Sequence, residues 1–273
     1  MRLRRADWRP WAFGLLVVAA AAQAGDEIVE QNVLQGKGKV NWTEKTITAR
    51  GSGAPNKKAA SPAAARLGAE RAAKLDAYRN ILETLKGVQV SSKKTGKDAL
   101  APAEISSQVE GILRGAQVID TVYYSDLSVD VVLRMPLDGA LTDALVPKPA
   151  KRSQVPSKGP LKNTGLVINA KGLHLVPAIA PRVLDEKKNE VYGVEFVSEK
   201  SMSETGIAGY VKDLDAAKKN DRVKDNPMVI KAIDTDKSNK TDIVISNADA
   251  DRLRDPATNH QYLADGKVLI VVD

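Results

Sequence analysis

The two histidines are the residues of this chain best suited to acid–base or metal chemistry near neutral pH. His174 lies in an apolar stretch, and His260 follows Pro256 in a polar one. Neither belongs to an HxH or HExxH spacing, which would bring metal ligands together on a strand or helix. The chain also has no G-x-S-x-G turn for a hydrolase nucleophile. We therefore expect surface or hydrogen-bonded core histidines, and we predict no catalytic residue, no metal ligand and no cofactor.

Acidic residues near the end of the chain are spaced as in an incomplete calcium loop. Asn247, Asp249 and Asp251 resemble its first three ligand positions, but Arg252 and Thr258 stand where the loop needs Gly and Glu. A second acidic group is equally incomplete and comprises Asp234, Asp236 and Asp242. We expect these carboxylates to cap helices or to lie in solvated loops.

The composition excludes several classes of site. The chain has 273 residues and no cysteine, so disulfides, zinc–thiolate centres, iron–sulfur clusters, thiol catalysis and a lipid anchor on cysteine are ruled out. Aromatic residues make up only 4% of the chain, too few for a platform on which nucleic-acid bases stack. Acidic and basic residues are interleaved, and we predict no nucleic-acid partner.

Residues 1–24 have the three parts of a secretory signal. A start with four arginines precedes an uncharged run over residues 11–22 and an Ala-Gln-Ala pattern that ends at Ala24. This run is shorter than the roughly 20 residues of a membrane-spanning helix. We predict export to the periplasm or outer envelope with cleavage near Ala24 and no transmembrane segment afterwards. An uncleaved N-terminal anchor is the alternative.

A basic, proline-rich segment divides the remaining chain. Residues 147–160 hold four Pro and four Lys or Arg, with no acidic residue. Proline at this density prevents a helix or a central strand, so we predict an extended linker. It would join a first domain over residues 32–146 to a second domain over residues 162–273.

The first domain is predicted to be α+β, with a mainly antiparallel sheet and a long helix packed on one face. Alternation over residues 37–50 indicates a hairpin that turns near residues 43–45. Residues 117–124 and 127–135 indicate a second strand pair. The other elements expected here are a strand at 88–91 and a helix at 103–113.

The long helix is predicted to begin at Ser61 and Pro62 and to run to Lys86, followed by Gly87. Its many alanines would let it lie close to a sheet. The apolar residues expected on one side are Ala64, Leu67, Leu75, Tyr78, Ile81, Leu82 and Leu85. Two cations, Arg71 and Lys74, project onto this side. We expect their stems to cover apolar surface; the alternative is that they are held for a partner or an acidic ligand.

Three segments of the first domain carry a resemblance to a known family. They are ARLGAERAAKLDAYRNILETLKGVQV (65–90), GILRGAQVIDTVYYSD (111–126) and VDVVLRMPLDGAL (129–141). Residues 51–139 thereby resemble the domain shared by the N-terminal part of flagellar assembly protein T and the twenty-kilodalton Lpp-type surface lipoproteins. The resemblance implies an exported envelope domain that binds or scaffolds other proteins, with no catalytic residues. Without cysteine, the chain lacks the acylation site of the lipoprotein members.

The second domain is predicted to be a strand-rich α+β or small barrel-like module. Ser246 and Asp249 resemble a capping box and predict a helix over residues 247–254. The final run KVLIVVD is expected to be buried or paired. The expected strands are 165–170, 173–178, 191–196, 228–233, 242–246 and 268–272.

These observations predict a non-enzymatic exported protein that acts as a scaffold or interaction module with protein partners in the cell envelope. Its specific form is a role in flagellar or other envelope assembly, with flagellar components or a second copy of the chain as partners. Two alternatives remain. One is an envelope enzyme acting on cell-wall glycan or peptide, since paired carboxylates meet in space and not in sequence. The other is a periplasmic ligand- or glycan-binding module.

Overall fold

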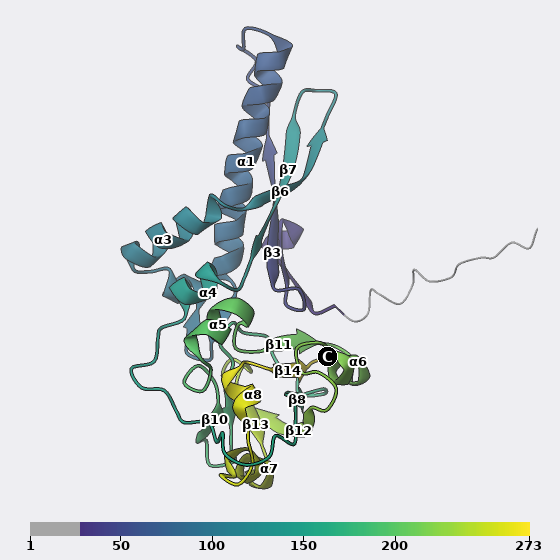
Figure 1. The fold of residues 1–273 in the computed structure, drawn as a ribbon. Helices are drawn as coiled ribbons and strands as arrows, with labels where there is room; N and C mark the ends of the chain where they lie inside the picture. Colours follow the sequence, from purple (N-terminus) through teal and green to yellow (C-terminus); the bar gives the residue numbers. More distant parts are fainter. Residues whose placement is uncertain (1–27) are drawn as a thin grey trace, which may run out of the picture.

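The computed structural model describes residues 28–273, which form two regions that meet end to end (Figure 1). Helices and strands are mixed in both regions, and the predicted α+β class is confirmed. Within the described residues, no helix combines the length and apolarity needed to cross a membrane. The predicted signal peptide, residues 1–24, lies outside the described residues.

The first region contains an antiparallel five-stranded sheet in the order β1-β2-β3-β7-β6. Its strands are β1 (Glu30–Val33), β2 (Gly38–Asn41), β3 (Thr46–Gly53), β6 (Gln117–Tyr123) and β7 (Val129–Pro136). The predicted hairpins are both present, as β2–β3 and β6–β7. The smaller elements are η1 (Leu34–Gly36), β4 (Gln89–Ser91), β5 (Lys94–Thr95), α2 (Gly96–Ala99), α3 (Ala103–Leu113) and α4 (Ala140–Leu145).

The long helix α1 (Pro62–Lys86) lies on one face of this sheet, over β3 and β7 (Figure 1). Its start follows the local signals, because Ser61 Oγ accepts a hydrogen bond from the Ala64 N–H at 3.1 Å and proline occupies the first helical position. The predicted bounds of α1 and α3 are confirmed.

The predicted buried side of α1 is confirmed only at its C-terminal end, where Ile81 and Leu85 are buried and Tyr78 and Leu82 pack against the core. Leu67 and Leu75 are 51% and 60% exposed. The residues that face the sheet are instead alanines spaced four apart: Ala65, Ala69, Ala73 and Ala77. They lie against Gly51 and Gly53 of β3, where the backbones are so close that a Cβ atom at Gly53 would overlap the carbonyl oxygen of Ala69. Small residues on both elements decide the contact, and the large leucines point away from it.

The second region is an open sheet of seven strands in the order β10-β9-β13-β12-β8-β14-β11. The interior strand β8 (Leu166–Asn169) pairs in parallel with β12 (Met228–Thr235) and with β14 (Val268–Val271), so the final apolar run is paired and buried as predicted. The other strands are β9 (Val183–Leu184), β10 (Glu190–Tyr192), β11 (Gly209–Val211) and β13 (Ile243–Ile245). The helices are α5 (Glu199–Thr205), α6 (Leu214–Lys219), α7 (Asn247–Arg254) and α8 (Gln261–Ala264).

The strand expected at 173–178 does not form, and that prediction was wrong. Gly172 and His174 have φ angles of 82° and 51°, a left-handed conformation that turns the chain and interrupts any extended run. Only Ala178 makes a β-bridge here, to Gln89 of the first region. The predicted helix at 247–254 is confirmed as α7.

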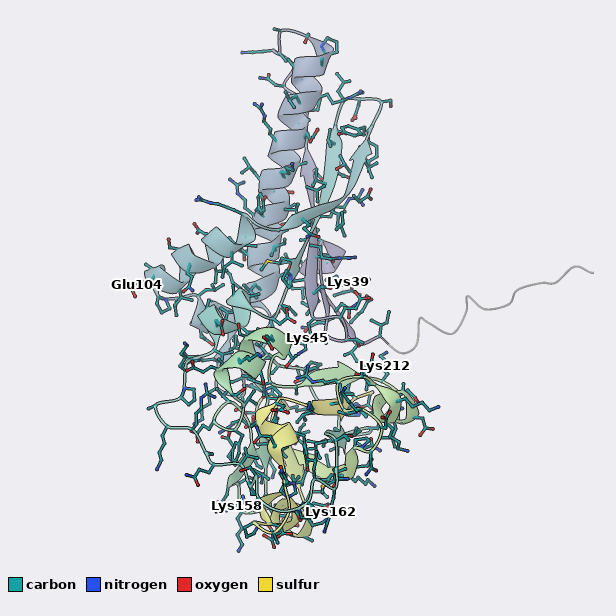
Figure 2. All side chains as sticks on the ribbon, viewed as in Figure 1. Lys39, Lys45, Glu104, Lys158, Lys162 and Lys212 are labelled. Carbon is teal, nitrogen blue, oxygen red and sulfur yellow. The ribbon has the colours of Figure 1, made fainter. Side chains whose placement is uncertain are left out.

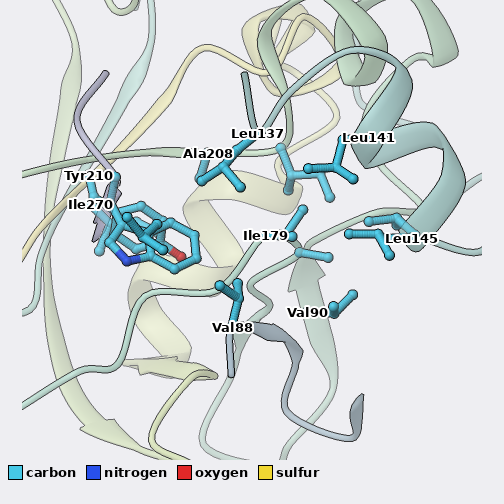
Figure 3. Packing of buried hydrophobic residues seen from close by; sticks show 14 of the residues in the cluster. Val88, Val90, Leu137, Leu141, Leu145, Ile179, Ala208, Tyr210 and Ile270 are labelled. Atoms are coloured by element: carbon cyan, nitrogen blue, oxygen red, sulfur yellow. The ribbon is translucent and has the colours of Figure 1, made fainter. Parts of the chain in front are cut away.

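The two regions share one hydrophobic core (Figure 3). We call the boundary where the two regions meet the seam. Backbone hydrogen bonds cross it, since the N–H groups of Ile179 and Ala180 donate to Gln89 O at 3.0 Å and to Val90 O at 2.8 Å. The buried residues in Figure 3 come from both sides and include Val88, Val90, Leu137, Leu141, Ile179, Ala208, Tyr210 and Ile270. The regions are therefore docked over an interface with an apolar core.

The proline-rich segment 147–160 contains no helix or strand and lies against the second region. The Ser153 N–H donates to Glu195 O at 2.9 Å, and Pro156 O accepts a bond of 2.7 Å from the His260 N–H. Val155 packs against the core. These bonds attach the linker to the second region along its length.

The glycine–alanine contact generates a stability prediction. Gly53→Ala should lower the free energy of unfolding by about 1–3 kcal/mol, because the added Cβ forces α1 away from β3. The matched control is Gly68→Ala on the open side of α1, where a Cβ meets nothing within 4 Å. It should raise the free energy of unfolding by about 1 kcal/mol through helix propensity. Urea titrations of both variants measure this, and equal effects would contradict the close contact.

Candidate functional site

The two histidines occupy opposite environments. His260 is fully buried, its Nδ1 lies 2.9 Å from Tyr262 Oη, and burial lowers its pKa. The side chain of His174 is 78% exposed, with Nδ1 3.6 Å from the Asp273 carboxylate. Between residues 28 and 273, no three side chains of the metal-binding types converge on one point. Among the described residues, neither histidine therefore belongs to a group of metal-ligating side chains.

The acidic groups singled out in the sequence serve the fold. Ser246 Oγ accepts a hydrogen bond from the Asp249 N–H at 3.1 Å, which caps α7 as the capping-box pattern indicates. Burial raises the pKa of Asp236, but hydrogen bonds outweigh this effect and hold the pKa well below its usual value. The backbone N–H groups that donate to this carboxylate belong to Ser238, Asn239, Thr241 and Asp242.

Two cations meet at the seam, and the sequence analysis missed them. Lys45 is the last residue of the β2–β3 turn and lies where the two regions meet (Figure 2). Its Nζ donates to Thr205 O at the end of α5 in the second region. Arg222 donates to the same oxygen at 2.7 Å and to Gly206 O at 2.9 Å. Cations are favourable at a helix C-terminus, so Lys45 links the first region to α5.

The surroundings of Lys45 make it titrate near neutral pH. Burial lowers its pKa and so does Arg222, while Asp138 opposes them, and the result is a pKa of about 7. A cavity of about 20 Å³ lies beside it and is lined by Trp42, Tyr210 and neighbouring residues. This volume holds about one water molecule, so the seam has no room here for a substrate.

A larger groove lies elsewhere along the seam. Its volume is about 360 Å³, and its walls are formed by residues 90–94 and 146–149 together with Ala180, Arg182, Glu190, Val194 and Glu195. The charged side chains in it are Lys93, Lys94, Lys148, Arg182, Glu190 and Glu195. Arg182 is already bound, since it pairs with Asp242 and donates to Ser92 Oγ at 2.9 Å. The groove has the size of a small-molecule site, with both signs of charge on its walls.

Apolar side chains are exposed on the part of the first region farthest from the seam. Here α1 and the β6–β7 hairpin project away from the second region (Figure 1). We call these residues the arm surface: Leu67, Leu75, Val118, Ile119, Val122, Tyr123 and Tyr124. These side chains lie on the outer side of α1 and on both faces of the β6–β7 hairpin, and exposed apolar groups gathered on one projecting part of a molecule are typical of interaction sites.

Hydrogen bonds from their hydroxyl groups hold the two tyrosines of the arm surface in place. Tyr123 Oη donates to the Glu70 carboxylate at 3.1 Å, and the Arg66 guanidinium lies 5.9 Å from the centre of the Tyr123 ring. Tyr124 Oη donates to the Asp130 carboxylate at 2.8 Å. The phenol rings are therefore fixed at the surface and exposed at the same time.

Comparison with known families identifies a similarity in the second region. Residues 165–273 match the family model of the second domain of Tp0624 from Treponema pallidum. No curated protein matches the chain. The resemblance of residues 51–139 to the flagellar and Lpp-type domain stays a prediction.

The titration of Lys45 predicts how stability depends on pH. Above pH 7 the folded chain loses the Lys45 proton, whereas in the unfolded chain this group keeps it up to about pH 10.5. The unfolded state then binds more protons, so the free energy of unfolding should rise between pH 7 and pH 9. Urea midpoints across this range measure the slope. The Lys45→Met variant is the control and should lose it; an unchanged slope in this variant would contradict the assignment.

Proposed function

We propose that this protein is a non-enzymatic, exported cell-envelope protein that acts as a scaffold or interaction module. The arm surface is the observation that carries this proposal. Its apolar side chains lie on a projecting helix and on the edge strand of a sheet, where they are exposed and not packed in the core. Covering them with a partner would remove apolar surface from water.

The export part of the proposal rests on the sequence of residues 1–24. Their basic start, apolar run and small-residue site are typical of a secretory signal. The resemblance of residues 51–139 to flagellar assembly protein T and the Lpp-type lipoproteins supports the same compartment. A role in flagellar or other envelope assembly is the specific form of the proposal, and its partners are envelope proteins.

A second candidate function is supported by the groove at the seam. A groove of about 360 Å³ between two regions is of the size and position at which small ligands bind. In this alternative, the protein is a periplasmic ligand- or glycan-binding module. A thermal-shift screen with cell-wall fragments tests it, because a ligand specific to the folded state raises the melting temperature.

Site-specific crosslinking tests the leading proposal. In the cells that produce the protein, a photo-crosslinking amino acid in place of Val122 should capture an envelope protein. The control places the same amino acid at Lys224, an exposed residue of the second region, which should capture less. Cell fractionation and N-terminal sequencing should find the chain in the envelope with Gly25 as its first residue. A cytoplasmic chain, or equal capture at both positions, would overturn the proposal.

A further inference from the structure

Strand β6 is an open edge of the five-stranded sheet. It pairs with β7 on one side only, from Gln117 opposite Arg134 to Tyr123 opposite Val129. Proteins usually protect a long sheet edge with charged residues or prolines, because its free backbone groups accept another strand. β6 is seven residues long, and it has no proline and a single charged residue, Asp120. A β-bulge at Ile119 interrupts the pairing between Val118 and Asp120, so the part of the edge left unprotected is the stretch after it, Asp120–Tyr123.

The hairpin geometry identifies the backbone groups that are free. The Tyr124 N–H donates to Ser128 O across the hairpin at 3.0 Å. In an antiparallel pair, residues alternate between bonding to the partner strand and facing away from it. Val122 therefore bonds toward β7, and Thr121 and Tyr123 direct their N–H and C=O groups to the open edge. An incoming strand would find its backbone partners there.

The side chains of β6 provide apolar contacts on both faces of the sheet. Residues that pair across two strands share a face, and Thr121 and Tyr123 pair with the buried Val131 and Val129 beneath α1. Val122 lies on the opposite face and is exposed. A strand added beside β6 would therefore bury apolar side chains on each face.

Cations outnumber anions around this edge. Arg66 and Glu70 both contact Tyr123, so the side of α1 that carries them faces β6. Lys74 is one turn further along that side, because residues four apart are neighbours on a helix. The cations around the edge are Arg50, Arg66, Lys74 and Arg134, and the anions are Glu70, Asp120 and Asp130, of which Asp130 pairs with Arg50. A strand with acidic side chains would be complementary to them.

We propose that the β6 edge binds a β-strand of a partner protein in which apolar residues alternate with acidic ones. This inference rests on the proposed function as an interaction module and specifies how the partner is held. A second copy of the chain fits less well. If β6 paired antiparallel with β6 of a second copy and the pairing were centred on Asp120, the two Asp120 carboxylates would lie opposite each other. If the pairing were centred on Thr121, the cations of α1 in one copy would lie close to those in the other.

A synthetic peptide tests the proposal on the full mature chain. The probe is a fluorescent peptide of about nine residues that alternates Val and Glu, and its control alternates Val and Lys. Fluorescence anisotropy should give a dissociation constant about ten-fold lower for the Glu peptide. Thr121→Pro should weaken its binding about ten-fold, because it removes a free edge N–H and no β6–β7 bond. Thr121→Val keeps that N–H and should bind normally.

Hydrogen exchange on the unaltered chain gives a second readout that does not depend on a folded proline variant. Saturating Glu peptide should slow amide exchange at Thr121 and Tyr123, with little change at Val122, which already bonds to β7. No slowing at these two amides, equal binding of both peptides, or a dimer that Thr121→Pro abolishes would each overturn the proposal. If Val122 still crosslinks an envelope protein in that case, the proposed function stands and strand addition is rejected.

Discussion

The contact between α1 and β3 determines most of what the first region can do. Glycines on the strand and alanines on the helix let the two backbones touch, and small residues are the only ones that permit this approach. The helix therefore uses its small side chains for packing and turns Leu67 and Leu75 outward. It also lies over β3 and β7, leaving β6 uncovered at the edge. The packing that stabilises the region thus creates the arm surface.

The seam sets the position of that surface relative to the second region. One core extends through both regions, and the chain around Ile179 and Ala180 is bonded to β4 as if it belonged to the same sheet. Lys45 adds a contact whose strength depends on its protonation state. An interface of this kind resembles the interior of a single domain more than a mobile contact between domains. The arm is consequently held at a fixed orientation.

Several polar groups that the sequence singled out form bonds within the fold. Asp236 organises a loop, Ser246 and Asp249 cap a helix, Asp242 pairs with Arg182, and His260 bonds to Tyr262 inside the core. Such groups are expected to be bonded when buried. Outside this network, the groove at the seam and the free backbone and apolar side chains of the arm surface are available to another molecule. The second of these suits a protein partner best.

Local signals in the sequence were sufficient for the bounds of α1, α3 and α7, since caps and periodicity act within a few residues. The pairing of β2 with β3 and of β6 with β7 followed for the same reason. Three features could not be predicted in this way. They are the alanine side of α1 that packs on the sheet, the missing strand at 173–178 and the role of Lys45. Each depends on residues that are distant in sequence: Gly53 on the helix it touches, and Lys45 on a carbonyl in the other region. Periodicity describes which residues share a side, but only tertiary contact decides which side is buried.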